Sequence, residues 1–132
     1  MKKLLVLFVL VLLMGCKKEP QPTVLNLAIT QQPTGGYNVE TVSATFTGSI
    51  TGDIVPVVVT IEWWWENGYH TDQKMKSTNN YTFSSATMNA FTTSWAASAG
   101  YYHLNYFWIK IKWTDANGAH VMESNKAYCD AS

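Results

Sequence analysis

VVVTIEWWWENGY, residues 57–69, is the stretch that decides the fold of this chain. Successive side chains of a β-strand point to opposite faces of the sheet. One face then carries only apolar side chains: Val57, Val59, Ile61, Trp63 and Trp65. The other face carries Val58, Thr60, Glu62, Trp64 and Glu66. The stretch therefore predicts a strand with one buried face, and Trp64 is the ring whose surroundings it leaves open.

A second stretch, FWIKIKW at residues 107–113, shows the same alternation. The side chains predicted to point inward are Phe107, Ile109, Ile111 and Trp113. Those predicted to point outward are Trp108, Lys110 and Lys112. Upstream, the apolar residues Leu104 and Tyr106 would point to the same side as Trp108, opposite to the inward set. Either a bulge lies near Asn105 or that end of the strand is buried on both faces.

Period-two patterns recur along the rest of the chain. Half-buried strands are predicted over residues 25–29 and 41–47, and shorter ones over 81–83 and 91–95. Residues 69–81 form a weaker region, with Met75 as their strong apolar anchor. Asp115, Asn117 and Gly118 are turn residues that predict a hairpin after the strand that ends near residue 114. About seven short strands with regular turns predict an antiparallel β-sandwich over residues 23–132, with a small antiparallel barrel as the alternative.

In order, length and pattern, this region resembles the immunoglobulin-like or fibronectin-like modules of bacterial surface proteins. The strand that ends in WTDANG and the following MESN look like the last hairpin of such a module. The resemblance implies that the third and sixth strands are neighbours in one sheet. Trp64 would then lie near Trp108, and Glu62 and Glu66 near Lys110 and Lys112. Cross-strand pairs of these kinds each contribute about 0.2–1 kcal/mol.

The chain begins MKKLLVLFVLVLLMGC, with two lysines, an apolar run over residues 4–14, and Gly15-Cys16. The run is too short for a permanent transmembrane helix and is typical of a secretory signal. The segment LMGC resembles the lipobox of bacterial lipoproteins. The resemblance implies cleavage after Gly15 and acylation of Cys16, with fatty acids such as palmitate. We expect a signal peptide over 1–15, the lipidated cysteine with a flexible tether over 16–22, and one domain over 23–132.

The lipid anchor implies a location in the bacterial cell envelope. Lysine follows Cys16, in contrast to the aspartate of inner-membrane retention signals in enteric bacteria, so the outer membrane is favoured and its face stays open. After cleavage, seven lysines face nine acidic residues, a net charge of about −2, and the chain contains no arginine. Without a basic stripe, nucleic-acid binding is not expected. Cys129 would remain as a single thiol with no partner.

Catalysis by acids, bases or nucleophiles needs such groups to converge. Glu62 and Glu66 share a strand face, but their Cβ atoms would lie about 13 Å apart at roughly 3.3 Å per residue. That separation is too wide for a paired-carboxylate glycosidase site. His70, His103 and His120 lack the spacing of zinc ligands. We therefore expect no enzyme, no metal and no cofactor.

The aromatic residues predict a non-catalytic binding or adhesion module. Trp64 and Trp108 would form an exposed strip edged by charges, a surface that stacks on sugar rings or serves as a protein contact. The tentative ligand-binding residues are Trp64, Trp108, Glu62, Glu66, Lys110 and Lys112. We expect a glycan or an envelope protein as partner, and alanine at both tryptophans would weaken binding with the fold intact. A structural or assembly subunit of an envelope complex is the alternative, and the outward rings could also serve the sheet alone.

Overall fold

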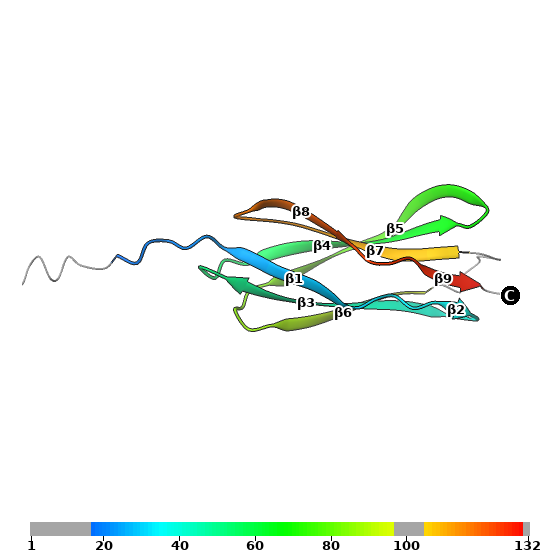
Figure 1. Ribbon diagram of the computed structural model, residues 1–132, viewed down its shortest axis with the longest axis horizontal. Coiled ribbons are helices and arrows are strands. Elements are labelled where there is room, and N and C mark those ends of the chain that lie inside the picture. Colours follow the sequence, from blue (N-terminus) through cyan, green and yellow to red (C-terminus); the bar gives the residue numbers. More distant parts are fainter. Residues whose placement is uncertain (1–16, 97–104, 131–132) are drawn as a thin grey trace, which may run out of the picture.

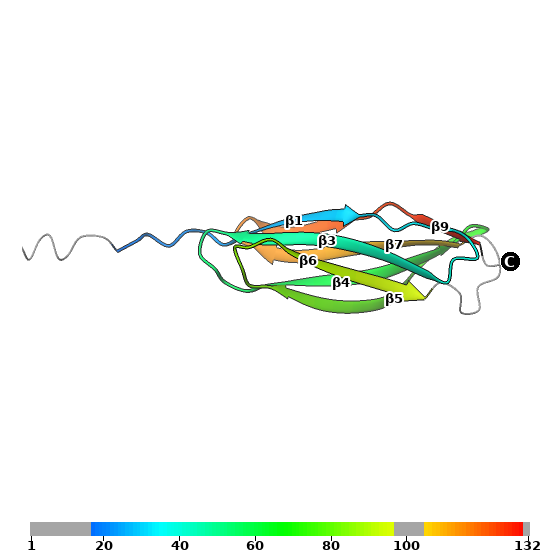
Figure 2. The ribbon, with the colours of Figure 1, turned by 90° about the horizontal axis from the view of Figure 1, so that it is seen from below.

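The computed structural model describes residues 17–96 and 105–130. These parts form an elongated all-β domain whose strands run along its long axis (Figure 1, Figure 2). The strands are β1 (Val24–Gln31), β2 (Gly36–Tyr37), β3 (Thr41–Thr51), β4 (Val57–Asn67), β5 (His70–Phe83), β6 (Asn89–Ala96), β7 (Asn105–Asp115), β8 (Gly118–Glu123) and β9 (Ala127–Asp130). Within the described ranges, no helix could cross a membrane.

The strands form two sheets, which confirms the predicted β-sandwich and makes the barrel alternative wrong. One sheet has the order β1-β3-β6, and the other has the order β2-β9-β7-β4-β5, with β8 also paired to β7. Strands β8 and β9 follow one another along the same edge of β7, opposite residues 110–115 and 105–107. All pairs are antiparallel except β2 with β9. The structure has more strands than the seven predicted for two reasons. It contains the two-residue strand β2, which is too short to be recognised in the sequence, and the last predicted strand is divided into β8 and β9.

The core confirms the alternation read from residues 57–65 and 107–111. Trp63 is 1% exposed and Trp65 is 9% exposed, and both belong to the buried core. The indole N–H of Trp63 donates to Thr93 Oγ1 at 3.0 Å, and that of Trp65 donates to Asn105 Oδ1 at 2.9 Å. Thr93 lies on β6, so the first bond joins the two sheets. A buried polar group is costly without a partner, and here both rings are satisfied.

Residues 69–81 are the largest departure from the sequence expectation. This weakly apolar region is part of β5, a strand of 14 residues at the edge of its sheet. It pairs with β4 from Val57 opposite Phe83 to Asn67 opposite His70. Backbone pairing holds it, and an edge strand with a solvated outer face needs few apolar residues. The predicted strand at 81–83 is the end of β5, while the one at 91–95 lies in β6.

The parity change before residue 107 reflects burial on both faces. The register of β4 with β7 runs without a shift from Asn67 opposite Asn105 to Val59 opposite Trp113. Asn105 is 2% exposed, and Tyr106 is half-buried on the other face. There is therefore no bulge at Asn105. Leu104 lies outside the described residues.

The predicted hairpin after β7 is present, and its first residue also holds β1. Asp115 pairs with Gly118, whose φ of 109° favours glycine. The Asp115 carboxylate accepts hydrogen bonds from the backbone N–H of Asn117 at 2.8 Å and of Leu25 at 3.0 Å. His120 Nε2 lies 2.9 Å from the same carboxylate. Asp115 thus fixes the start of β1 to the β7–β8 turn.

Candidate binding face

The outer face of the larger sheet brings Trp64 and Trp108 together, as the sequence predicted. The two residues are directly opposite in the register of β4 with β7. Their rings are stacked, with centroids 6.2 Å apart and planes inclined by 24°. Offset stacking of this kind adds about 0.5–1.5 kcal/mol beyond the area that it buries.

The expectation that both rings are exposed is wrong for Trp108, which is only 1% exposed. The ammonium group of Lys126, between β8 and β9, lies 4.5 Å from the centroid of the Trp108 ring. Lys126 also pairs with Glu66. The long lysine side chain covers the ring while its charge reaches the surface. Trp108 is therefore part of the packed structure and is not open to a ligand.

Trp64 is half-buried and engaged on two sides. Its indole N–H donates to Glu62 Oε2 at 2.9 Å. The Lys110 ammonium lies 4.6 Å from its ring centroid. A flat, two-tryptophan platform is consequently absent from this face.

The predicted charges form three separate ion pairs. Glu62 binds Lys112 at 2.7 Å, and Lys110 binds Glu123 at 2.9 Å. Glu66 lies opposite Tyr106, away from the two predicted lysines, and pairs with Lys126. The predicted proximity of Glu62 to Lys112 is therefore confirmed, whereas the partner of Glu66 is Lys126 and was not predicted.

Glu62 and Glu66 both have lowered pKa values. Burial alone would raise the pKa of Glu62, but hydrogen bonds from Lys112 and Trp64 and the nearby lysine charges outweigh it and lower the pKa. Hydrogen bonds from Lys126 and Gln73 lower the pKa of Glu66. A carboxyl group with a lowered pKa is a poor proton donor at neutral pH.

Tyrosines extend the face toward the end of the sheet where β2 and β9 lie. Tyr106 pairs with Tyr128 across β7 and β9, and their ring centroids are 5.7 Å apart. Tyr37, on β2, meets Tyr128 edge-to-face at 6.4 Å and is 75% exposed. We call these three tyrosines, together with Trp64 and Trp108, the aromatic face.

Sequence reasoning missed the tyrosines. The outward parity of Tyr106, opposite Glu66, was a usable signal. Tyr37 enters the face only through the parallel pairing of Gly36 and Tyr37 with Cys129 and Asp130, which no local pattern predicts. Burial and the neighbouring Asp130 carboxylate raise the pKa of Tyr128, whose hydroxyl donates to Asp130 Oδ2 at 3.2 Å.

The histidines and other metal-ligand types do not converge in the described part of the chain. No group of three His, Cys, Asp or Glu side chains there could hold a metal ion. His120 is committed to Asp115 and stacks on Trp113, with centroids 4.9 Å apart. His103 lies outside the described residues. Cys129 is buried and free, and burial raises the pKa of its thiol.

No protein-family model matches this sequence, and no curated protein sequence matches it. Among solved structures, the chain is similar to the beta-glucosidase from Listeria innocua, with 9% identity and a TM-score of 0.54 over 83% of this chain. The gluconolactone complex of that enzyme gives 11% identity and a TM-score of 0.53 over 82% of this chain. In both comparisons the chain spans 16% of the length of the enzyme chain. Likeness at this identity shows the fold alone.

Proposed function

We propose that this chain is a lipid-anchored, non-catalytic binding module of the bacterial envelope. The observation that carries the binding role is the aromatic face, where Tyr37 is 75% exposed beside Tyr128 and Tyr106. Aromatic rings with polar tips give large contact area and hydrogen-bonding groups at once. They are accordingly common at recognition surfaces.

The partner proposed for this face is a glycan. Sugar rings stack on exposed aromatic side chains, and polar groups at the rim hydrogen-bond sugar hydroxyls. The tyrosine row has both features, since Asp130 and the pair of Glu66 with Lys126 border its rings. An envelope protein is the other possible occupant, and neither nucleic acid nor a cofactor is proposed.

A non-catalytic role is supported by the state of the carboxylates on this face. Glu62 and Glu66 are each paired with a lysine and have lowered pKa values. Neither is poised to donate a proton to a leaving group. The likeness to a segment of beta-glucosidase chains covers only 16% of those chains and therefore brings no activity with it.

The anchor is proposed from the lipobox-like LMGC at residues 13–16. Cys16 would carry the acyl chains, and the outer membrane is the favoured location. Mass spectrometry of the mature amino terminus tests this proposal. An amino terminus that begins at Cys16 and carries the mass of acyl groups supports it, whereas an unmodified terminus at another residue refutes it.

The binding role is tested with matched tyrosine variants. Tyr37→Ala combined with Tyr128→Ala removes the exposed end of the aromatic face, while Tyr69→Ala removes an exposed ring, 66% accessible, from the β4–β5 turn. On a glycan array, the first variant should lose at least tenfold in binding and the second should bind like the parent. Equal binding by all three proteins would remove the aromatic face as the site.

An assembly role is the second candidate, and the β5 edge favours it. Among the described residues β5 pairs only with β4, so the other edge of this strand of 14 residues is open. Open edges accept a further strand. Proline at Thr78 or Asn80, which the register with β4 places with their backbone N–H toward the open edge, would block such pairing. Loss of an envelope complex with retained glycan binding would favour this role.

A further inference from the structure

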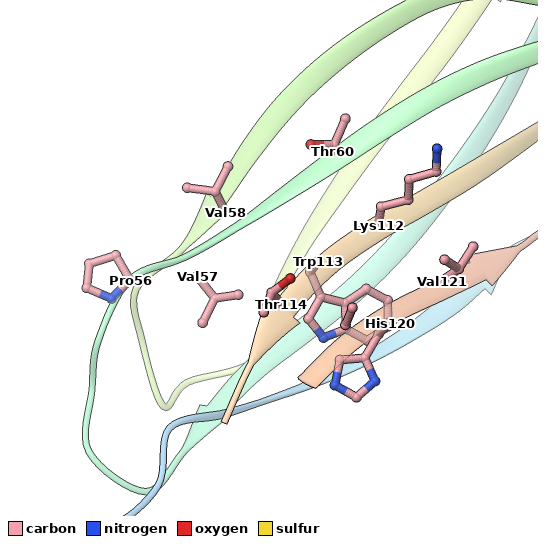
Figure 3. A pocket seen from close by; sticks show the side chains of 10 residues that line it. Pro56, Val57, Val58, Thr60, Lys112, Trp113, Thr114, His120 and Val121 are labelled. Atoms are coloured by element: carbon pink, nitrogen blue, oxygen red, sulfur yellow. The ribbon is translucent and has the colours of Figure 1, made fainter. Parts of the chain in front are cut away.

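Exposed aliphatic side chains gather at the end of the sandwich where β1 begins. Ile54 and Val55 in the β3–β4 loop are 49% and 54% exposed. Val58 and Val121 are 52% and 62% exposed and lie beside the loop on the outer face of the larger sheet. Together with Pro56 we call these residues the apolar patch. A shallow pocket of about 520 Å³ adjoins the patch; Pro56, Val58 and Val121 line it together with polar side chains that include Lys112 and His120. Figure 3 shows these side chains.

The chain that leads to Cys16 is fixed to this same loop. The Gln21 N–H donates to Asp53 Oδ2 at 3.1 Å, and the Asp53 N–H donates to the Gln21 carbonyl at 3.2 Å. The Thr23 hydroxyl donates to the Asp53 carbonyl at 2.7 Å. A Cβ on Gly52 would lie 1.9 Å from the Pro22 carbonyl oxygen, so the approach requires glycine. The flexible tether expected over residues 16–22 therefore ends before Gln21.

The short remaining tether limits how far the loop can lie from an acylated Cys16. Five Cα steps separate Cys16 from Gln21, which span at most about 17 Å when fully extended. The headgroup layer on one side of a bilayer is itself roughly 5–8 Å thick. An acylated Cys16 would thus hold the β3–β4 loop at the membrane surface.

We propose that the apolar patch rests in the interface of the lipid bilayer that holds the acyl chains of Cys16. This inference depends on the lipid anchor of the proposed function. Aliphatic side chains held at the membrane surface are transferred from water into the boundary between headgroups and acyl chains, which is favourable. Lys17 and Lys18, exposed in the segment between Cys16 and Gln21, suit anionic headgroups. The Asp53 carboxylate accepts a hydrogen bond from the Gln21 N–H, so its charge faces the segment that leads to Cys16.

The contact would orient the aromatic face toward a partner. Val58 and Glu66 lie on the same face of β4, eight residues apart, which corresponds to about 26 Å along the strand. The tyrosine row next to Glu66 would stand clear of the headgroups, while the other end of the same sheet touches them. Figure 1 shows that β1 begins at one end of the domain and β9 ends at the opposite one.

Site-directed spin labelling of the full acylated chain tests the contact. Val55→Cys and, in a second protein, Val121→Cys carry the label on the patch, and Tyr69→Cys carries it on the β4–β5 turn. Cys129→Ala is included in each protein, so that the introduced thiol reacts alone. The proteins are placed in vesicles of phosphatidylethanolamine and phosphatidylglycerol, and collisions of the label with oxygen and with a water-soluble nickel chelate are measured.

Both patch labels should lose at least threefold in nickel collision rate and gain in oxygen collision rate relative to the chain without residues 1–16 in solution. The Tyr69 label should not change. An acylated chain that floats with vesicles but keeps both patch labels open to nickel overturns the contact and leaves the anchor standing. A chain whose mass shows no acyl group overturns both. If the patch labels are equally protected in the chain without residues 1–16, and this protection rises with protein concentration, the patch contacts a second copy and the lipid contact is overturned.

Discussion

Replacing Asp115 with Asn should destabilise the domain strongly at neutral pH. The side chain of Asp115 is 1% exposed and accepts hydrogen bonds from the Leu25 and Asn117 backbone and from His120. Burial alone would raise its pKa, but these hydrogen bonds outweigh it and lower the pKa from the ordinary value of 3.8 to about 2. At about 1.4 kcal/mol per pKa unit, the ionised carboxylate contributes roughly 2.5 kcal/mol to folding at pH 7.

The amide of Asn also replaces one acceptor oxygen with a donor that faces other donors. The variant should therefore lose at least about 2 kcal/mol in free energy of unfolding. Because the folded pKa lies below the unfolded one, this stabilisation is complete above about pH 5 and is lost as the pH falls through 3.8 toward 2. The difference between parent and variant should shrink in the same window.

Urea denaturation of the chain without residues 1–16, at pH 7 and at pH 3, measures both effects. Asp72→Asn, at an exposed position of β5, removes the same charge and should change stability by less than about 0.5 kcal/mol. An Asp115→Asn protein as stable as the parent at pH 7 would refute the role assigned to this carboxylate. If the difference in free energy of unfolding between parent and variant is the same at pH 7 and at pH 3, the loss comes from packing and not from the charge.

Three further predictions concern buried groups. Trp108→Ala should cost about 3–5 kcal/mol by urea denaturation, whereas Trp108→Phe, which keeps most of the volume, should cost less than about 1.5 kcal/mol; equal, small losses would show that the ring is exposed after all. Thr93→Val leaves the buried Trp63 indole N–H without its acceptor and should cost about 1–3 kcal/mol, and a neutral result would contradict the bond between the sheets. Cys129 should react with a thiol reagent at least a hundredfold more slowly in the folded chain without residues 1–16 than in urea, because burial raises its pKa; fast labelling of the folded chain would speak against that burial.

The sequence predicted the two central strands well because their burial has a period of two. The alternation at residues 57–65 and 107–111 predicted the core. The resemblance to an immunoglobulin-like module implied that these strands are neighbours, and the opposite charges and the two tryptophans supported that pairing. The register confirms it, with Glu62 opposite Lys110 and Trp64 opposite Trp108. Where a strand has a polar outer face and lies at an edge, as β5 does, this signal is weak and its extent was missed.

The candidate site was predicted less well, because parity tells the face of a side chain and not what covers it. Trp108 is on the predicted face, yet Lys126 from a connecting segment lies over its ring. The tyrosine row needs β2 and β9 to pair in parallel, although they are far apart in sequence. Exposure therefore depended on residues that no local pattern connects with the two tryptophans.

By itself, the sequence determined the all-β class, the inward set of β4 and β7 and the β7–β8 hairpin, since all of these follow from local periodicity and turn chemistry. The pairing of β4 with β7 was expected only from the resemblance to an immunoglobulin-like module. Tertiary structure alone decided which rings are covered, where the tyrosines meet and how the tether is held. These features rest on contacts between residues distant in the chain: 32 positions for Gln21 with Asp53, 60 for Lys126 with Glu66, and 90 for Leu25 with Asp115. Such contacts form only when the whole chain is folded, and their partners leave no mark in a local pattern.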